Sequence, residues 1–113
     1  GAFQMTGMEL STIVRRGGCP IVIVLDNGGY GTERFLHHGD WKYNDIHPWK
    51  YHKLPEILGG GTGYEVFTEG QLDAALGQAW NDRRGFSLIQ AHLPKLDASD
   101  ALRRLTERLS QRV

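Results

Sequence analysis

The feature that most constrains this chain is an apolar, β-branched run that ends in a glycine-rich turn. Residues 21–25 read Ile-Val-Ile-Val-Leu, a pattern typical of a strand buried on both faces in a parallel sheet. The turn that follows reads Asp-Asn-Gly-Gly at 26–29. In open α/β sheets, ligands bind beyond the carboxyl ends of such strands. Residues 26–33 are therefore the first candidates for a functional site.

The rest of the chain alternates predicted helices and strands. Capping signals and glycine stops predict helices over 6–16, 32–37, 52–58 and 69–79, and a last one after Ser99. Further strands are expected at 64–67 and 86–92. This order predicts an α/β fold, part of a three-layer open parallel sheet with crossover helices. Only about three strands are present by this count, so both sheet edges are expected to be unpaired.

Composition narrows the class of protein. The chain has 113 residues, enough for one small domain, and its formal net charge of zero gives no reason to expect nucleic acid or an anionic membrane as partner. No apolar run approaches the roughly 20 residues of a membrane helix. The single cysteine, Cys19, is expected to be a buried thiol and fits a cytoplasmic protein. The chain opens at Gly1 without a methionine, as a trimmed chain would.

The turn at 26–29 has the chemistry of a metal site. An Asn side chain and free backbone carbonyls are hard oxygen ligands that suit Mg²⁺. Turn amides that lead into a helix can cradle the phosphates with which Mg²⁺ is usually shared. Asn and Gly are also common in ordinary strand-to-helix turns for conformational reasons. The turn alone leaves both interpretations open.

Several separated motifs together resemble the thiamine-diphosphate enzymes. Residues 1–6, Gly-Ala-Phe-Gln-Met-Thr, resemble the continuation of the Gly-Asp-Gly that opens the fingerprint of that family. Asp26-Asn27 stands 25 residues after Gly1, at the end of an apolar strand, like the second element of the fingerprint. The segments at 29–33, 43–46, 49–51 and 93–97 are similar to pyruvate and indolepyruvate decarboxylases. The resemblance implies that residues 1–113 are the later half of the C-terminal domain that binds the diphosphate and magnesium.

The resemblance also implies roles for individual residues. It places the backbone of Gly1 and Ala2 against the diphosphate of thiamine diphosphate. The Mg²⁺ ligands would be the side chain of Asn27 and the carbonyl oxygen of Gly29. The remaining residues of the turn, which would line the phosphates and the thiazolium ring, are Tyr30, Gly31 and Thr32.

Glu33 matches the active-site glutamate of the decarboxylases, which manages protons after carbon dioxide leaves. A carboxyl group shielded from water beside the substrate could donate such a proton. The alternative is an exposed carboxylate in the first turn of a helix, favoured there by the helix dipole. His37 and His38 are expected at the surface, and His47, His52 and His92 in structural roles.

Three departures from the family pattern concern the metal site. The Asp of Gly-Asp-Gly would precede Gly1. Asp26 stands where the family usually has Asn and adds a negative charge, for which we expect a structural role. Gly28 replaces a more usual polar residue and makes the turn more flexible.

The function implied by the resemblance is that of a thiamine-diphosphate- and Mg²⁺-dependent 2-oxo-acid decarboxylase that releases carbon dioxide and an aldehyde. Such enzymes are homodimers or homotetramers with the site between two subunits, so the isolated 113 residues are expected to be inactive. One alternative is an acetolactate-synthase-like carboligase, against which Glu33 and the Tyr-Asn-Asp-Ile segment at 43–46 argue. The other is a non-catalytic binding or regulatory domain that kept the fold.

Overall fold

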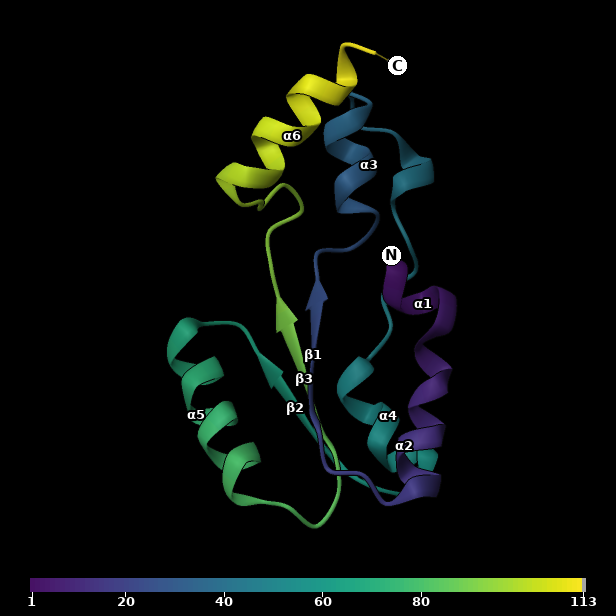
Figure 1. Ribbon diagram of the computed structural model, residues 1–113, viewed down its shortest axis with the longest axis vertical. Helices are drawn as coiled ribbons and strands as arrows, with labels where there is room; N and C mark the ends of the chain where they lie inside the picture. The colour runs from purple at the N-terminus through teal and green to yellow at the C-terminus, as the bar shows by residue number, and fades with distance from the viewer. Residues whose placement is uncertain (113) are drawn as a thin grey trace.

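Three parallel strands form the centre of the molecule (Figure 1). The computed structural model describes residues 1–112. The strands are β1 (Ile21–Asp26), β2 (Thr62–Val66) and β3 (Ser87–His92). The helices are α1 (Ala2–Thr6), α2 (Leu10–Arg16), α3 (Gly31–Leu36), α4 (Leu54–Leu58), α5 (Glu69–Asn81) and α6 (Asp100–Ser110), with short 3-10 helices η1 (Gly7–Glu9), η2 (Lys42–Asn44) and η3 (Tyr51–Lys53). None of the helices within this described range is long and apolar enough to cross a bilayer.

The strand order is β1-β3-β2, so the last strand in sequence lies in the middle of the sheet. Ile21 pairs with Ser87 on one side of β3, and Thr62 pairs with the same residue on the other. Both connections between parallel strands pass through helices, α3 and α4 after β1 and α5 after β2. The predicted α/β class, with three parallel strands and two unpaired edges, is confirmed over the described chain.

Helices cover the sheet on both faces, which makes three layers (Figure 1). On the face toward α2 and α4, Val24 and Leu88 pack with Tyr51, Leu54 and Phe86. On the opposite face, α5 covers a smaller cluster made of Val66, Ala75, Ile89 and Ala91. Beyond the carboxyl ends of the strands, α3 and α6 pack against each other.

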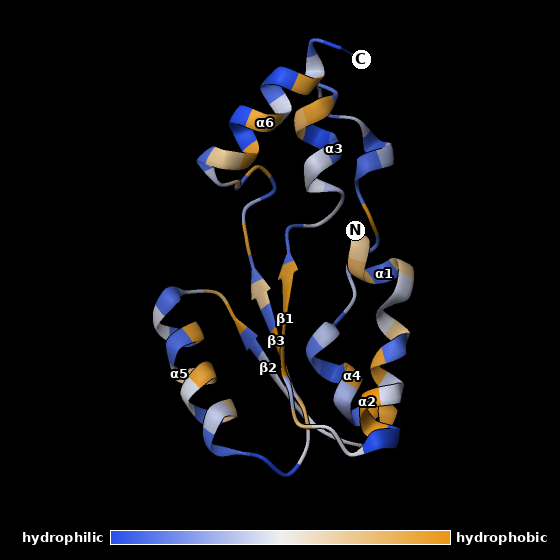
Figure 2. Cartoon of the chain, viewed as in Figure 1, coloured by the Kyte–Doolittle hydropathy of each residue, from blue (hydrophilic) through white to orange (hydrophobic). Residues whose placement is uncertain are grey.

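The prediction that the first strand is buried on both faces is wrong. Val24 is 5% exposed, but Ile23 and Leu25, on the α5 side, are 44% and 64% exposed. Of the residues in β1, only Ile21 packs against the cluster that α5 covers. The carboxyl-terminal half of β1 is hydrophobic in Figure 2 and yet bare on this face. A β-branched run therefore predicts a strand, but the helices and strands packed around that strand decide which of its faces are buried.

The predicted first helix, 6–16, is also partly wrong. The chain is already helical at Ala2, and the run is broken into α1, η1 and α2. The side chain of Thr6 makes no capping hydrogen bond, and Glu9 instead accepts one from Thr12 Oγ1 at 3.2 Å. The early start has a packing cause, because the ring of Phe3 meets Tyr51 edge-on at 5.1 Å between centroids.

The other predicted caps are confirmed. Thr68 Oγ1 accepts from the amide of Gln71 at 3.1 Å, and Ser99 Oγ accepts from the amide of Leu102 at 3.2 Å. The leucine stripe of α6 is only partly covered, since Leu105 and Leu109 are exposed.

Smaller differences concern boundaries and one thiol. The second strand begins at Thr62 and ends at Val66, so Phe67 lies outside it and stacks on His92. The helix predicted at 52–58 is split into η3 and α4. Cys19 is half-buried rather than buried, because it precedes an edge strand.

Candidate functional site

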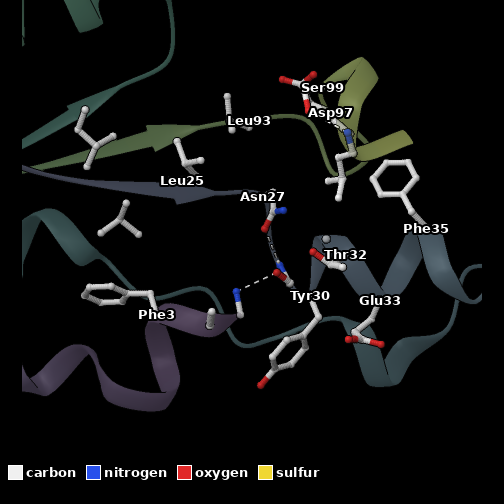
Figure 3. A pocket seen from close by; sticks show the side chains of 18 residues that line it. Phe3, Leu25, Asn27, Tyr30, Thr32, Glu33, Phe35, Leu93, Asp97 and Ser99 are labelled. Atoms are coloured by element: carbon white, nitrogen blue, oxygen red, sulfur yellow. Dashed lines mark hydrogen bonds between the residues drawn. The ribbon is translucent and has the colours of Figure 1, made fainter. Parts of the chain in front are cut away.

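The candidate site is the turn between β1 and α3. Gly28 has φ +74°, a left-handed conformation that favours glycine, and a Cβ there would meet nothing within 4 Å. Side-chain oxygens support the turn, because Asp26 Oδ1 accepts from the amide of Gly28 at 3.3 Å and Asn27 Oδ1 from that of Gly29 at 3.4 Å. The second bond is drawn in Figure 3. Gly28 thus allows the left-handed shape of the turn, whereas the sequence alone predicted only a more flexible turn.

All eight residues singled out from the sequence line one cavity of about 860 Å³. They are Gly1, Ala2, Asn27, Gly29, Tyr30, Gly31, Thr32 and Glu33. In the view of Figure 3, Leu25 and Leu93 lie on one side of Asn27, and the side chains of Tyr30 and Glu33 project toward the other. The structure therefore brings the predicted residues together, while their individual roles stay predictions.

Gly29 lies close to the nitrogen of Gly1 and to the side chain of Asn27. The amino group of Gly1 donates a hydrogen bond to Gly29 O at 2.8 Å (Figure 3). The amide oxygen of Asn27 lies two residues away in the same turn. This pair of hard oxygens fits Mg²⁺.

Two glycines of the turn are required by close packing. A Cβ on Gly29 would collide with Asn44 O and Arg34 Nη2. A Cβ on Gly31 would lie 2.6 Å from Asn27 Nδ2. Side chains at these positions would therefore displace either the backbone of the turn or the predicted metal ligand.

The surroundings of Glu33 within this chain are those of the second interpretation, an exposed carboxylate in the first turn of a helix, here α3. The shielding from water expected for a proton donor is not provided by residues 1–112. For Glu33 to act as proposed from the resemblance, atoms outside this chain must cover it.

The most important residue that sequence reasoning missed is Arg34. Its side chain is buried and contacts the turn, the segment at 44–45 and the segment after β3. Asp45 is its ion-pair partner at 2.9 Å and also binds Lys95 Nζ at 3.0 Å. The hydrogen bond of Lys95, and then that of Arg34, lower the pKa of Asp45. The only sequence signal was an arginine in a helix directly after the turn, which is indistinguishable from a solvent-exposed one.

A second missed feature is a polar network around Gln90, in the middle of the sheet. Gln90 is buried; its Nε2 donates to Asp26 Oδ2 at 2.8 Å, and its Oε1 accepts from the amide of His52 at 3.2 Å. Glu65 Oε2 lies 3.2 Å from His92 Nε2 and 3.4 Å from His52 Nδ1. Asp26 thus turns its charge toward Gln90, in keeping with the structural role expected for it.

The aromatic loop at 41–51 divides into two parts. Tyr51 is buried against Phe3, and burial raises the pKa of its hydroxyl. Trp41 and Tyr43 stack on each other with centroids 6.1 Å apart and are exposed. Within the loop at 41–51, Trp41 and Tyr43 are the aromatic residues exposed enough to contact something beyond this chain.

Comparison with known families agrees with the fold. Residues 1–91 match the family described as thiamine pyrophosphate enzyme, C-terminal TPP binding domain. This match covers well over half of the chain, which therefore belongs to that family.

Individual relatives include enzymes and a regulator. The chain is 36% identical over 116 residues to a pyruvate decarboxylase of Aspergillus terreus, covering 99% of this chain and 20% of the relative. It is 41% identical over 109 residues to the thiamine metabolism regulatory protein THI3 of Saccharomyces cerevisiae, covering 90% and 17%. An alpha-keto-acid decarboxylase of Mycobacterium avium is 38% identical over 99 residues, covering 86% and 18%. The chain spans about a fifth of the length of these relatives.

Proposed function

We propose that this chain is the later half of the cofactor domain of a thiamine-diphosphate- and Mg²⁺-dependent 2-oxo-acid decarboxylase, which releases carbon dioxide and an aldehyde. The observation that carries the proposal is that Asn27 and Gly29 lie in one turn at the carboxyl end of β1 and line the same cavity as the other residues named from the resemblance. The decarboxylase names of two relatives support the reaction class.

In this proposal, the residues of the turn bind and orient Mg²⁺ and thiamine diphosphate. Asn27 Oδ1 and Gly29 O would hold Mg²⁺, and the backbone of Gly1 and Ala2 would lie against the diphosphate. Tyr30, Gly31 and Thr32 would line the rest of the cofactor site. When bound, thiamine diphosphate supplies the electron sink that decarboxylation needs.

Glu33 is the proposed proton donor. It lines the same cavity as the proposed metal ligands and is exposed in this chain. Covering by another domain or subunit would remove water from it, which fits a homodimeric or homotetrameric protein with a site between subunits. We propose a cytoplasmic location, and small 2-oxo acids as substrates without nucleic acid or membrane partners, in keeping with the zero formal net charge.

The test is an assay of the full-length protein with 2-oxo acids, thiamine diphosphate and Mg²⁺. We expect Glu33→Gln to lower kcat about 100- to 10,000-fold while cofactor binding persists. Glu56→Gln is the matched control, because Glu56 is also an exposed carboxylate in the first turn of a short helix. Equal kcat values for Glu33→Gln and the wild type would remove Glu33 from the mechanism. The isolated 113 residues are expected to show no turnover.

A regulatory protein is the second candidate, favoured by the 41% identity to a thiamine metabolism regulatory protein. In that case the full-length protein would bind thiamine diphosphate and Mg²⁺ but would not consume 2-oxo acids. The acetolactate-synthase-like carboligase is distinguished by its product, since a carboligase yields an acetohydroxy acid rather than an aldehyde.

A further inference from the structure

Arg34 lies in the short helix α3 and turns its side chain back under the preceding turn. The residue is 5% exposed. Nη1 donates to Asn27 O at 2.9 Å and to Lys95 O at 3.1 Å. Nη2 donates to Asp45 Oδ1 at 2.9 Å and to Asn44 O at 3.4 Å. One guanidinium therefore joins three segments that are far apart in sequence.

The segment at 44–46 also pairs with the turn that carries the proposed metal ligands. Gly29 forms an isolated antiparallel bridge with Asp45. On either side of this bridge, the amide of Tyr30 donates to Asn44 O at 2.8 Å, and that of Ile46 donates to Gly28 O at 3.1 Å. Because a Cβ on Gly29 would strike Arg34 Nη2, the turn is packed directly against the guanidinium.

The charges around Arg34 show that it is not itself a ligand-binding group. Its four Nη hydrogen bonds all go to protein oxygens, and Nε is buried with no partner among residues 1–112. Two carboxylates, Asp45 and Asp40, face the two cations Arg34 and Lys95. The cluster is formally neutral, so it adds no net charge beside the proposed metal site.

We propose that Arg34 is a positioning residue that holds the Asn27–Gly29 turn in the shape that binds the metal. This inference rests on the proposed function, in which Asn27 and Gly29 are Mg²⁺ ligands. Two consecutive glycines leave the turn many conformations. The guanidinium fixes the peptide of Asn27 by its carbonyl and does not bond to the side-chain oxygen, which accepts only from the Gly29 amide, at 3.4 Å, among residues 1–112. A lysine cannot replace this fork, because its single nitrogen lacks the planar array of donors.

The test compares Arg34→Lys and Arg34→Met in the full-length protein with Arg103→Met as control. Arg103 also donates to a backbone carbonyl, Leu96 O at 3.1 Å, and lies over the Phe35 ring of α3, but it does not contact the turn. Mn²⁺ binding in the presence of thiamine diphosphate is followed by electron paramagnetic resonance. Loss of a group that orients metal ligands typically weakens metal affinity about 10- to 100-fold. We expect that loss for Arg34→Met, a smaller one for Arg34→Lys, and none for Arg103→Met.

Amide hydrogen exchange of the metal-free protein provides the second readout. The amides of Tyr30 and Ile46 should exchange faster in Arg34→Met, and that of Leu88 in the core should not change. If Arg34→Met folds poorly, Arg34→Lys carries the same comparison.

Wild-type Mn²⁺ affinity in both Arg34 variants would overturn the inference while leaving the proposed function intact. Weaker Mn²⁺ binding with unchanged exchange at Tyr30 and Ile46 would also overturn it, since Arg34 would then act through its charge alone. A wild-type protein that binds no Mn²⁺ would refute the proposed function, and the inference with it.

Discussion

The strands β1 and β3 are both apolar runs, yet they have different surroundings. All residues of β3 from Ser87 to Ala91 are buried, and Leu88 is completely inaccessible. In β1, only Val24 is buried, and Leu25 is 64% exposed. Their compositions do not explain the difference, because β3 even carries Gln90. Position explains it: β3 has a strand on each side and helices on both faces, whereas β1 is an edge strand that α5 covers only at its start.

The comparison teaches where this chain is stable and where it is open to partners. The buried strand holds the three layers together, and the open strand delivers the candidate site. The carboxyl end of β1 is held by hydrogen bonds from Arg34 to Asn27 and from Gln90 to Asp26 rather than by apolar packing. The four predictions that follow test this contrast.

The largest effect is expected in the core. Leu88→Ala should lower the free energy of unfolding by about 2–5 kcal/mol, because it leaves a cavity in the cluster that Leu88 forms with Val24, Tyr51, Leu54 and Phe86. Leu25→Ala should cost no more than about 1 kcal/mol in the 113-residue chain, since its side chain is largely in water. Urea denaturation measures both. In the full-length protein, the cost of Leu25→Ala should rise toward that of a core leucine if another element covers it; an unchanged cost would show that this face stays open.

The next effect concerns the end of β1. Gly29→Ala should destabilise the chain by about 1–3 kcal/mol, because its Cβ overlaps a backbone oxygen that cannot move independently. Gly28→Ala, with nothing near its Cβ, should cost about 1 kcal/mol for the left-handed φ alone. Thermal denaturation of the pair separates packing from backbone conformation. Equal costs would mean that Asn44 and Arg34 do not pack tightly on this turn.

A third prediction compares the two helix caps expected from the sequence. Thr68→Ala should destabilise the chain by about 1 kcal/mol, because Thr68 caps the helix that covers β3. Thr6→Ala should have almost no effect, because Thr6 makes no capping bond. Circular dichroism during urea unfolding measures both stabilities. An equal loss of stability in the two variants would show that Thr6 does cap its helix, against the structure.

The smallest effect is a dependence on pH. The pKa of Asp45 is lowered, first by its hydrogen bond with Lys95 and then by that with Arg34. The stabilisation from Asp45 is therefore complete above its ordinary pKa of about 4 and is lost as pH falls through the lowered value. Asp45→Asn should make the free energy of unfolding depend less on pH in this acid range. It should also make the amide hydrogen of Tyr30 exchange faster.

Asp82 is the matched control in the loop before β3, where Arg84 lowers the pKa of Asp82 to about 2. Its replacement by Asn should alter acid stability without affecting Tyr30. Carboxyl titration by NMR checks both pKa directions, and a Tyr30 amide that responds equally to the two replacements would contradict the link between Asp45 and the turn.

Much of the fold was predictable because local patterns carry it. The three strands, their parallel arrangement and the caps at Thr68 and Ser99 follow from apolar runs, turn residues and hydroxyl spacing. The eight candidate site residues were also predicted to lie together, and they line one cavity. The errors at Thr6 and in the burial of β1 arise from contacts with Tyr51 and from the reach of α5, which no local pattern contains.

The sequence by itself determined the class of fold, the family and the turn that carries the candidate ligands, because these depend on residue types at fixed spacing. Only the tertiary structure decided that Arg34 clamps that turn, that Gln90 anchors Asp26 and that one face of β1 is left bare. These properties depend on which distant groups meet, such as the Arg34 guanidinium with the Lys95 carbonyl and the Gln90 side chain with the His52 ring. A hydrogen bond between residues far apart in sequence leaves no periodic trace in the chain, and it exists only once the sheet has brought its partners together.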